Sequence, residues 1–167
     1  MKEITKKYKK LVFKFKSKIN LDINSIEYKS LDELFNFFGT DKGTSVVDPY
    51  THGSKEELGH GFAKFYEENF IKYKKDIFNL LEIGTWEGAS TAAFASFFPY
   101  SKIYGIDKNF RFKYKSKRIS FNYCDIRNVN DIKNLKKKLK SITFKIIIDD
   151  ASHMLSDMIY SLKFFIK

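Results

Sequence analysis

The sequence predicts an α/β fold built on a doubly wound parallel sheet. Three observations support this class. Short apolar segments recur between residues 76 and 150, most of them are followed by a stretch with helical periodicity, and the first leads into a turn with two glycines. Strands that alternate with helices are typical of parallel sheets, because each connection must cross back over the sheet before the next strand begins.

Residues 1–75 are predicted to form a basic, helical N-terminal extension. The first 21 residues, MKEITKKYKKLVFKFKSKINL, combine lysines with scattered apolar side chains. This pattern favours a lysine-coated helix or strand at the edge of the domain, and an amphipathic element on an anionic membrane is the alternative. The apolar run is too short and too interrupted for a signal peptide.

Two helices and a long loop are expected in the rest of this extension. Residues 26–38 carry apolar side chains at helical spacing, with Ser30 as the predicted N-cap and Gly39 as the predicted end. The loop GTDKGTSVVDPYTHGS follows, and long ordered loops are often functional. His52 within it is expected to be an ordinary loop residue. Helical periodicity returns over residues 56–73.

Residues 76–167 are predicted to hold the sheet. The expected strands are 77–84, 102–107, 119–125 and 142–150. The last of these is the most hydrophobic and β-branched, which predicts a central position. The expected helices are 90–98, 129–140 and a final one from residue 154 onward. Residues 108–118 are highly charged and predict only a short, weak helix.

Composition narrows the class of protein. A chain of 167 residues suits one domain. The single cysteine, Cys124, excludes an intramolecular disulfide and fits a reducing compartment, so we expect a cytoplasmic protein. No stretch approaches the roughly 20 apolar residues that span a bilayer. The net charge of +11 fits either a lysine-rich genomic composition or a basic face for an anionic partner.

Acidic residues stand where the predicted strands end. These acids, with a histidine just beyond the last strand, are Glu82, Asp107, Asp125, Asp149, Asp150 and His153. Ligands of such sheets bind at the carboxyl ends of the strands, so we expect the side chains to converge on one crevice. The alternatives are that Asp149 and Asp150 cap the following helix and that His153 is structural.

The turn EIGTWEG after the first predicted strand indicates which ligand binds there. A pyrophosphate needs the positive N-terminus of a helix, and Glu82 and Glu87 would repel it. They favour S-adenosylmethionine, which carries an ammonium and a sulfonium. Asp107, about 20 residues further on, suits the ribose hydroxyls, and Asp125 suits the adenine amino group. Trp86 is either a lid over the ligand or part of the core.

The series LLEIGTWEGAS, IYGID, YCDIRN and IIIDDASH resembles the class I S-adenosylmethionine-dependent methyltransferases, which have a Rossmann-like fold. With FGTDKGT at 38–44 and HGFAKFYEENF at 60–70, the chain is similar more narrowly to the metal-dependent sugar O-methyltransferases of the macrocin and mycinamicin type. The resemblance covers roughly residues 30–167. The glycine turn is common to the superfamily, whereas the combination with GTDK, HGF and IIIDDASH is much more specific.

The resemblance implies a role for each matching position. The residues expected to bind the cofactor are Glu82, Gly84, Thr85, Gly88, Asp107, Asp125, Ile126 and Asp149. Those around the turn would line its methionine end, the acid after the second strand would hold the ribose, and the pair after the third strand would hold the adenine. Asp150 would ligate Mg²⁺, and His153 would be the general base for a sugar hydroxyl, a poor nucleophile.

The chain departs from this group in one respect. The group's other metal ligands, a Glu-Asp pair at the end of a fifth strand, find no match before Lys167. We therefore expect the C-terminal strands of the fold to be absent, through a fragment, through truncation of the gene, or because a partner supplies them. The open edge of such a sheet favours pairing with another copy of the chain.

The expected function is methyl transfer to a sugar hydroxyl on a glycan, a nucleotide-sugar or a glycosylated natural product. Three alternatives stay open. A non-catalytic S-adenosylmethionine-binding protein would follow from the missing strands. A nicotinamide-linked oxidoreductase is disfavoured because the turn lacks a third glycine. A nucleic-acid methyltransferase would suit the basic charge, but the chain shows no evident base-stacking motif.

Overall fold

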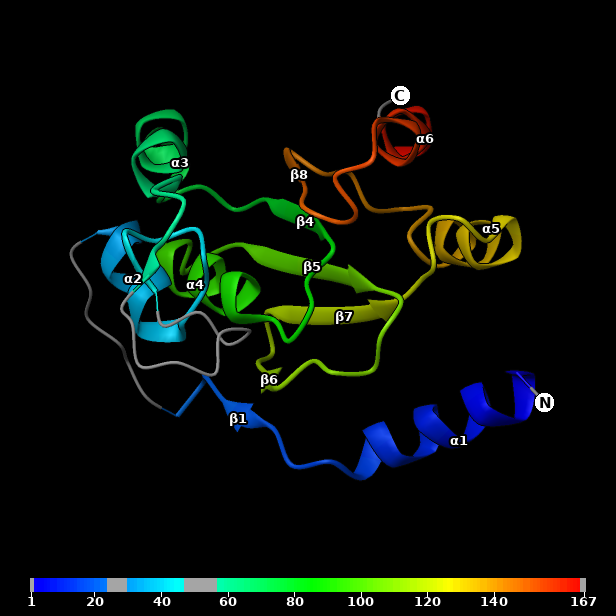
Figure 1. Ribbon diagram of the computed structural model, residues 1–167. Coiled ribbons are helices and arrows are strands. Elements are labelled where there is room, and N and C mark those ends of the chain that lie inside the picture. The colour runs from blue at the N-terminus through cyan, green and yellow to red at the C-terminus, as the bar shows by residue number, and fades with distance from the viewer. Residues whose placement is uncertain (1, 24–29, 47–56, 166–167) are drawn as a thin grey trace.

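The computed structural model describes residues 2–23, 30–46 and 57–165. Its centre is a parallel sheet with the strand order β7-β5-β4-β8 (Figure 1). The strands are β4 (Asn79–Ile83), β5 (Lys102–Asp107), β7 (Ile119–Tyr123) and β8 (Ile146–Asp149). This confirms the predicted fold class and all four predicted strands, each one shorter than or equal to its predicted range.

The helices fall on the two faces of this sheet. They are α2 (Leu31–Phe38), α3 (Ala63–Phe70), α4 (Ala89–Phe97), α5 (Val129–Lys138) and α6 (Leu155–Phe165). One core cluster joins α2, α3 and α4 to alternate strand residues such as Leu80 and Ile103. A second cluster joins α5 and α6 to the strand residues that point to the opposite face, such as Leu81 and Tyr104. Both faces are therefore covered, as a parallel sheet requires.

The alternation of side chains along β4 decides which face of the sheet Glu82 points to. Leu80 belongs to the cluster beneath α4, and Leu81 and Ile83 belong to the opposite cluster. Because successive strand side chains point to opposite faces, Glu82 shares the face of Leu80 and lies under α4. There it is buried completely.

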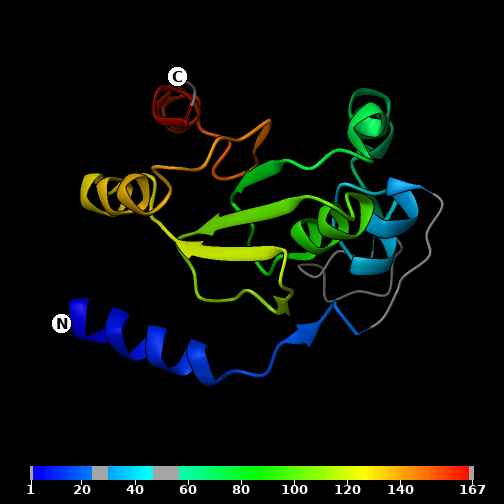
Figure 2. The same ribbon diagram turned by 180° about the vertical axis from the view of Figure 1, so that it is seen from behind.

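The N-terminal segment forms a helix, α1 (Lys2–Phe15), followed by a short strand, β1 (Ile19–Asn20). Strand β1 pairs in parallel with β6 (Tyr114–Lys115). Residues 108–118 therefore form a turn and a strand, and the prediction of a weak helix there is wrong. The carbonyls of Lys113 and Lys115 accept hydrogen bonds from the N–H groups of Ile19 and Leu21. Helix α1 lies beside β7 on that side of the sheet (Figures 1 and 2).

Two further expectations need correction. The predicted helix over 56–73 begins only at Ala63, because residues Glu57–Leu58 form strand β3, which pairs with β2 (Ser45–Val46). A 3-10 turn, Ile71–Tyr73, ends it. Strand β8 is not central in the described part of the chain, where it pairs with β4 alone. Its hydrophobicity reflects the two cores: Ile146 and Ile148 belong to the cluster on the α4 side, and Ile147 packs against the opposite cluster.

The caps of α2 follow the prediction. The Ser30 hydroxyl accepts a hydrogen bond from the Glu33 backbone N–H at 3.2 Å, and Gly39 ends the helix with a left-handed backbone, φ 71°. The predicted regions 1–75 and 76–167 share one core cluster, which includes Leu31 and Phe94. The boundary between them stays a prediction. Across the described residues, no helix has the length and apolar character that crossing a bilayer requires.

Candidate functional site

A cavity of about 830 Å³ lies at the carboxyl ends of the strands. Most of its lining comes from the GTDK loop, the turn after β4, the end of β5, the segment after β7 and the segment after β8, and residues such as His60 and Tyr114 add to it. Its volume is in the range of small-molecule and cofactor sites. We call the side formed by Gly84, Thr85, Trp86, Asp107 and Asn109 the turn end. We call the side formed by Asp41, Lys42, His60, Asp150 and His153 the loop end.

The turn after β4 brings the sheet close to the cavity. The Gly84 backbone has φ 88°, and a Cβ there would overlap the backbone oxygen of Asp150 and the Cα of Ala151. Only glycine fits this close approach of two strand ends. Thr85 follows it, almost fully buried, and its hydroxyl finds no hydrogen-bond partner among the described residues. The cavity thus has a polar group that a ligand can satisfy.

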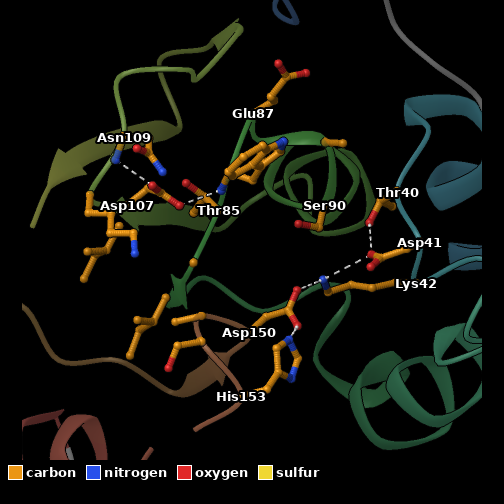
Figure 3. A pocket seen from close by; sticks show the side chains of 18 of the residues that line it. Thr40, Asp41, Lys42, Thr85, Glu87, Ser90, Asp107, Asn109, Asp150 and His153 are labelled. Carbon is orange, nitrogen blue, oxygen red and sulfur yellow. Dashed lines mark hydrogen bonds and ion pairs between the residues drawn. The ribbon is translucent and has the colours of Figure 1, made fainter. Parts of the chain in front are cut away.

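Asp107 is fixed at the turn end by backbone donors. Its Oδ2 accepts a hydrogen bond from the Trp86 N–H at 2.9 Å, and its Oδ1 accepts one from the Asn109 N–H at 2.6 Å (Figure 3). Each carboxylate oxygen keeps a lone pair for a further donor. The carboxylate is therefore preorganised for hydroxyl groups of a ligand.

The segment after β7 supplies a mixed wall. Asp125 and Ile126 both line the cavity, and Asp125 Oδ1 accepts a hydrogen bond from the Arg127 N–H at 3.1 Å. Cys124 also lies there, and burial raises the pKa of its thiol to about 12. It is a neutral, packed side chain, as expected for a buried cysteine.

Glu82 does not reach the cavity. Its two carboxylate oxygens accept short hydrogen bonds from the hydroxyls of Ser90 and Thr91 in the first turn of α4. Burial raises its pKa, while Lys42 and the two hydroxyls act in the opposite direction. Glu82 thus ties the start of α4 to β4 from beneath, and its expected direct contact with a cofactor stays a prediction.

Lys42 of the GTDK loop is the cation at the loop end. Its side chain is 4% exposed, and its Nζ pairs with Asp150 Oδ2 and lies 3.9 Å from Asp41 Oδ1 (Figure 3). Burial lowers its pKa, but the carboxylates of Glu82 and Asp150 outweigh that effect and the net shift is upward. Lys42 is therefore charged at neutral pH, pairs with Asp150 and attracts the Glu82 carboxylate beneath the cavity.

The loop that carries Lys42 is held by Asp32 of α2. Asp32 accepts hydrogen bonds from the Thr44 N–H at 2.8 Å and from the Thr44 hydroxyl at 2.6 Å. The start of α3 adds a bond from the Ala63 N–H to the Lys42 carbonyl at 3.1 Å. A buried lysine on a loop needs such anchoring, because an unpaired buried charge is costly.

His153 lies beside Asp150 on the side away from Lys42. Its Nε2 is 3.5 Å from Asp150 Oδ1, and its side chain is 78% exposed. Its backbone has φ 54°, and the other non-glycine residue with a positive φ in the described ranges is Trp86, at 50°. Both line the cavity. Non-glycine residues held in this region are strained, and such strain gathers at functional sites.

Asp149 points away from the cavity. Its Oδ2 accepts a short hydrogen bond from the Ser161 hydroxyl of α6, and its Oδ1 accepts one from the Ala151 N–H at 3.2 Å. It therefore holds the turn after β8 against α6. Its partner Ser161 lies well inside α6, so Asp149 does not cap the start of that helix, and its predicted cofactor role stays a prediction without a cavity contact.

Gly88 is required by packing. A Cβ there would overlap the Phe112 ring, so the glycine admits an aromatic side chain rather than a ligand. Glu87 pairs with Lys113, which neutralises the charge that was expected to repel a pyrophosphate. The Arg111 guanidinium lies 4.2 Å from the centre of the Trp86 ring, which places that ring at the rim. The electrostatic argument from Glu82 and Glu87 is thus weaker than the sequence indicated.

Sequence reasoning brought together most of the site and missed two parts of it. Seven expected residues line the cavity: Gly84, Thr85, Asp107, Asp125, Ile126, Asp150 and His153. It assigned no role to Lys42, although the GTDK motif contains it. His60, the first residue of the HGF motif, lies at the rim, with Nε2 3.8 Å from Asp41 Oδ2. His52 lies outside the described residues.

Asp150 is a carboxylate at the loop end that could bind a metal ion. Among residues 2–23, 30–46 and 57–165, no group of three His, Cys, Asp or Glu side chains has the arrangement of a metal site. Mg²⁺ prefers oxygen ligands and keeps several waters, so Asp150 suits it as a single ligand. A complete protein site would need ligands beyond those described.

One curated protein shares sequence with the chain. Mycinamicin VI 2''-O-methyltransferase of Micromonospora griseorubida is 29% identical over 102 residues, which span 57% of this chain and 25% of that protein. No protein-family model matches.

Solved structures share the fold. The MycE methyltransferase from the mycinamycin biosynthetic pathway, in complex with Mg, SAH and mycinamycin VI, matches with a TM-score of 0.65 and 27% identity. That match covers 83% of this chain and 36% of the other chain. A complex of the same enzyme with Mg and SAH matches with a TM-score of 0.64 and 26% identity. The resemblance to class I methyltransferases of this type is confirmed, over about a third of their length.

Proposed function

We propose that this chain, with the fold of a class I methyltransferase and sequence similarity to a macrolide sugar O-methyltransferase, binds S-adenosylmethionine and transfers its methyl group to a sugar hydroxyl. One observation carries the proposal. The preorganised Asp107 carboxylate and the Asp150–His153 pair line opposite ends of the same cavity. A site for a donor and a site for an acceptor would thus be adjacent.

The turn end would hold the cofactor. Asp107 would accept hydrogen bonds from the ribose hydroxyls, and Asp125 and Ile126 would contact the adenine. The buried hydroxyl of Thr85, without a partner among the described residues, would face the methionine part. Glu82 would support this end through Ser90 and Thr91 rather than by touching the ligand.

The loop end would hold the acceptor. The acceptor oxygen attacks the methyl carbon in line, the carbon–sulfur bond breaks, and S-adenosylhomocysteine leaves as the neutral thioether. The imidazole of His153 would take the hydroxyl proton, and the neighbouring Asp150 carboxylate would stabilise the imidazolium that forms. The exposure of His153 leaves it accessible to a bulky acceptor.

A divalent cation belongs to the proposal through Asp150. The solved relatives contain Mg, and Asp150 is the one expected metal ligand that the described residues place in the cavity. When bound, such an ion supplies Lewis-acid polarisation of an acceptor oxygen. In the described structure Lys42 provides the positive charge beside Asp150 instead.

Titration calorimetry tests the proposal. S-adenosylmethionine and S-adenosylhomocysteine should each bind with one site per chain, and NADH should not bind. Formation of S-adenosylhomocysteine with a panel of nucleotide-sugars and glycosides would then identify the acceptor class. Absence of binding by both adenosyl ligands would overturn the proposal, and binding of NADH alone would favour the oxidoreductase alternative.

A non-catalytic cofactor-binding protein is the second candidate. The single carboxylate at Asp150, already paired with Lys42, favours it. Binding of both adenosyl ligands without turnover on any acceptor, with or without Mg²⁺, would select this candidate over the enzyme.

A further inference from the structure

The outer face of α1 carries an apolar stripe. Ile4, Tyr8, Leu11 and Phe15 recur at spacings of four, three and four residues, which places them on one side of a helix. They are 74%, 66%, 55% and 82% exposed. Scattered exposed apolar residues need no explanation, but a continuous stripe along a whole helix does. We call these four residues the α1 stripe.

The opposite face of α1 attaches the helix to the domain. The Phe13 ring lies 5.6 Å from the Phe110 ring and 5.3 Å from the Phe121 ring, measured between centroids. Lys6 Nζ pairs with Asp131 at 2.9 Å and lies 4.1 Å from the centre of the Tyr123 ring. At about 100° per residue, Lys6 and Phe13 lie opposite the stripe. The attachment therefore turns the stripe away from the domain, in agreement with the exposure of its side chains. Helix α1 itself lies at the edge of the domain (Figures 1 and 2).

Exposed lysines flank the stripe. Lys7 and Lys14 follow one border of it, Lys9 and Lys10 lie further round the helix toward the attached face, and Lys16 follows the end of α1. This is the arrangement of a helix that lies in a lipid interface, with apolar side chains among the acyl chains and ammonium groups at the phosphates. Their long stems allow lysines to reach from beside an apolar face to the headgroups.

We propose that α1 docks the protein on an anionic lipid surface, with the α1 stripe inserted and the bordering lysines on the headgroup phosphates. A second copy of the chain fits the stripe less well, because stripe against stripe would set lysines against lysines. Nucleic acid would attract the lysines but leave the apolar side chains in water. The proposal does not depend on the methyltransferase reaction.

Co-sedimentation of the full chain with vesicles tests this. The chain should pellet with vesicles that contain phosphatidylglycerol and stay in solution with phosphatidylcholine alone. The double variant Leu11→Glu and Phe15→Glu should weaken binding roughly tenfold or more, because two apolar side chains that would insert among the acyl chains are lost. Lys7→Gln and Lys14→Gln should each weaken it roughly fivefold.

Matched controls lie elsewhere on the surface. Ile77→Glu changes an apolar side chain that is 87% exposed but outside α1, and Lys137→Gln removes an exposed lysine of α5. Neither should alter binding, and circular dichroism confirms that every variant folds. The proposal fails if the Leu11 and Phe15 variant binds anionic vesicles as tightly as the wild type. It also fails if no vesicle is bound, or if the stripe instead mediates a dimer in analytical ultracentrifugation.

Discussion

The two ends of the cavity are built from different interactions. At the turn end, the Asp107 carboxylate accepts two backbone N–H groups from segments next to it. At the loop end, Lys42 and Asp150 meet from segments 108 residues apart, and His153 is held in a strained backbone conformation. A backbone-built end can form before a ligand arrives. An end built from side-chain pairs can exchange its partners when a ligand or a cation enters.

Because of this difference, substitutions at the two ends of the cavity should have different effects on stability and on activity. Substitutions beneath the cavity or at the turn should lower the free energy of unfolding, because they break packing and buried hydrogen bonds. Substitutions of exposed groups at the loop end should cost the fold little or no stability and act on the reaction. The following variants test that division in order of decreasing expected effect.

Glu82→Ala should cause the largest loss of stability. It leaves Lys42 without one of its carboxylate neighbours and leaves the Ser90 and Thr91 hydroxyls without their acceptor. Removing one partner from a buried charged network costs about 3–5 kcal/mol, which denaturant unfolding will measure. Glu87→Ala is the control, because its exposed pair with Lys113 should contribute about 1 kcal/mol or less. Equal losses would contradict the assigned role of Glu82.

Gly84→Ala should have the next largest effect. The added Cβ would overlap the backbone of Asp150 and Ala151 and force the two strand ends apart, at a cost of about 1–3 kcal/mol. Gly61→Ala is the matched control. It has a similar φ of 66° with no atom within 4 Å of the added Cβ, so it incurs the left-handed strain without the overlap. A thermal-melt comparison that ranks Gly61→Ala as the worse variant would exclude this explanation.

His153→Gly should stabilise the fold while abolishing methyl transfer. Glycine removes the strain of the left-handed backbone at φ 54°, worth about 1 kcal/mol. The control is Met154→Gly at the next position. The Met154 backbone is not left-handed, so glycine relieves no strain there and this variant should lose stability in the same unfolding measurement. If His153→Gly keeps full activity on an identified acceptor, His153 is not the base.

Asp157→Asn should have the smallest effect and a defined pH dependence. Hydrogen bonds from Arg127 and Ser152 lower the pKa of Asp157 below its ordinary value. A carboxyl with a lowered folded-state pKa contributes stability above its unfolded pKa and loses it as the pH falls through the folded value. The small difference between wild type and variant should therefore vanish in strong acid. A difference that grew on acidification would contradict this assignment.

The turn end could be predicted from the sequence, and the loop end could be predicted only in part. Asp107 ends β5 and Asp125 lies two residues beyond β7, and parallel strand ends meet at one edge, so local patterns were sufficient. The pairing of Lys42 with Asp150 depends on how α2 and α3 pack on α4, which no local pattern contains. Likewise, the side of β4 that Glu82 faces follows from alternation, but its two hydroxyl donors depend on the register of α4.

The strands were predicted better than the edges of the domain. Apolar runs such as IIID identified β8, although its hydrophobicity suggested a central place that the described residues do not give it. Strand β6 escaped prediction because two residues among lysines carry no period, and its partner β1 lies 95 residues away in the chain. Short strands paired over such distances are specified by tertiary packing rather than by local propensity.

The affinity for S-adenosylhomocysteine and for its analogue without the two ribose hydroxyls tests the central claim most directly. Loss of hydrogen bonds to the Asp107 carboxylate should weaken wild-type binding roughly tenfold to a hundredfold. Asp107→Ala should weaken binding of the parent ligand similarly and abolish the difference between the two ligands. Asp22→Ala, which removes a carboxylate similarly bonded to a backbone N–H but outside the cavity, should change neither value. Equal wild-type affinity for both ligands, or no affinity for either, would contradict the account.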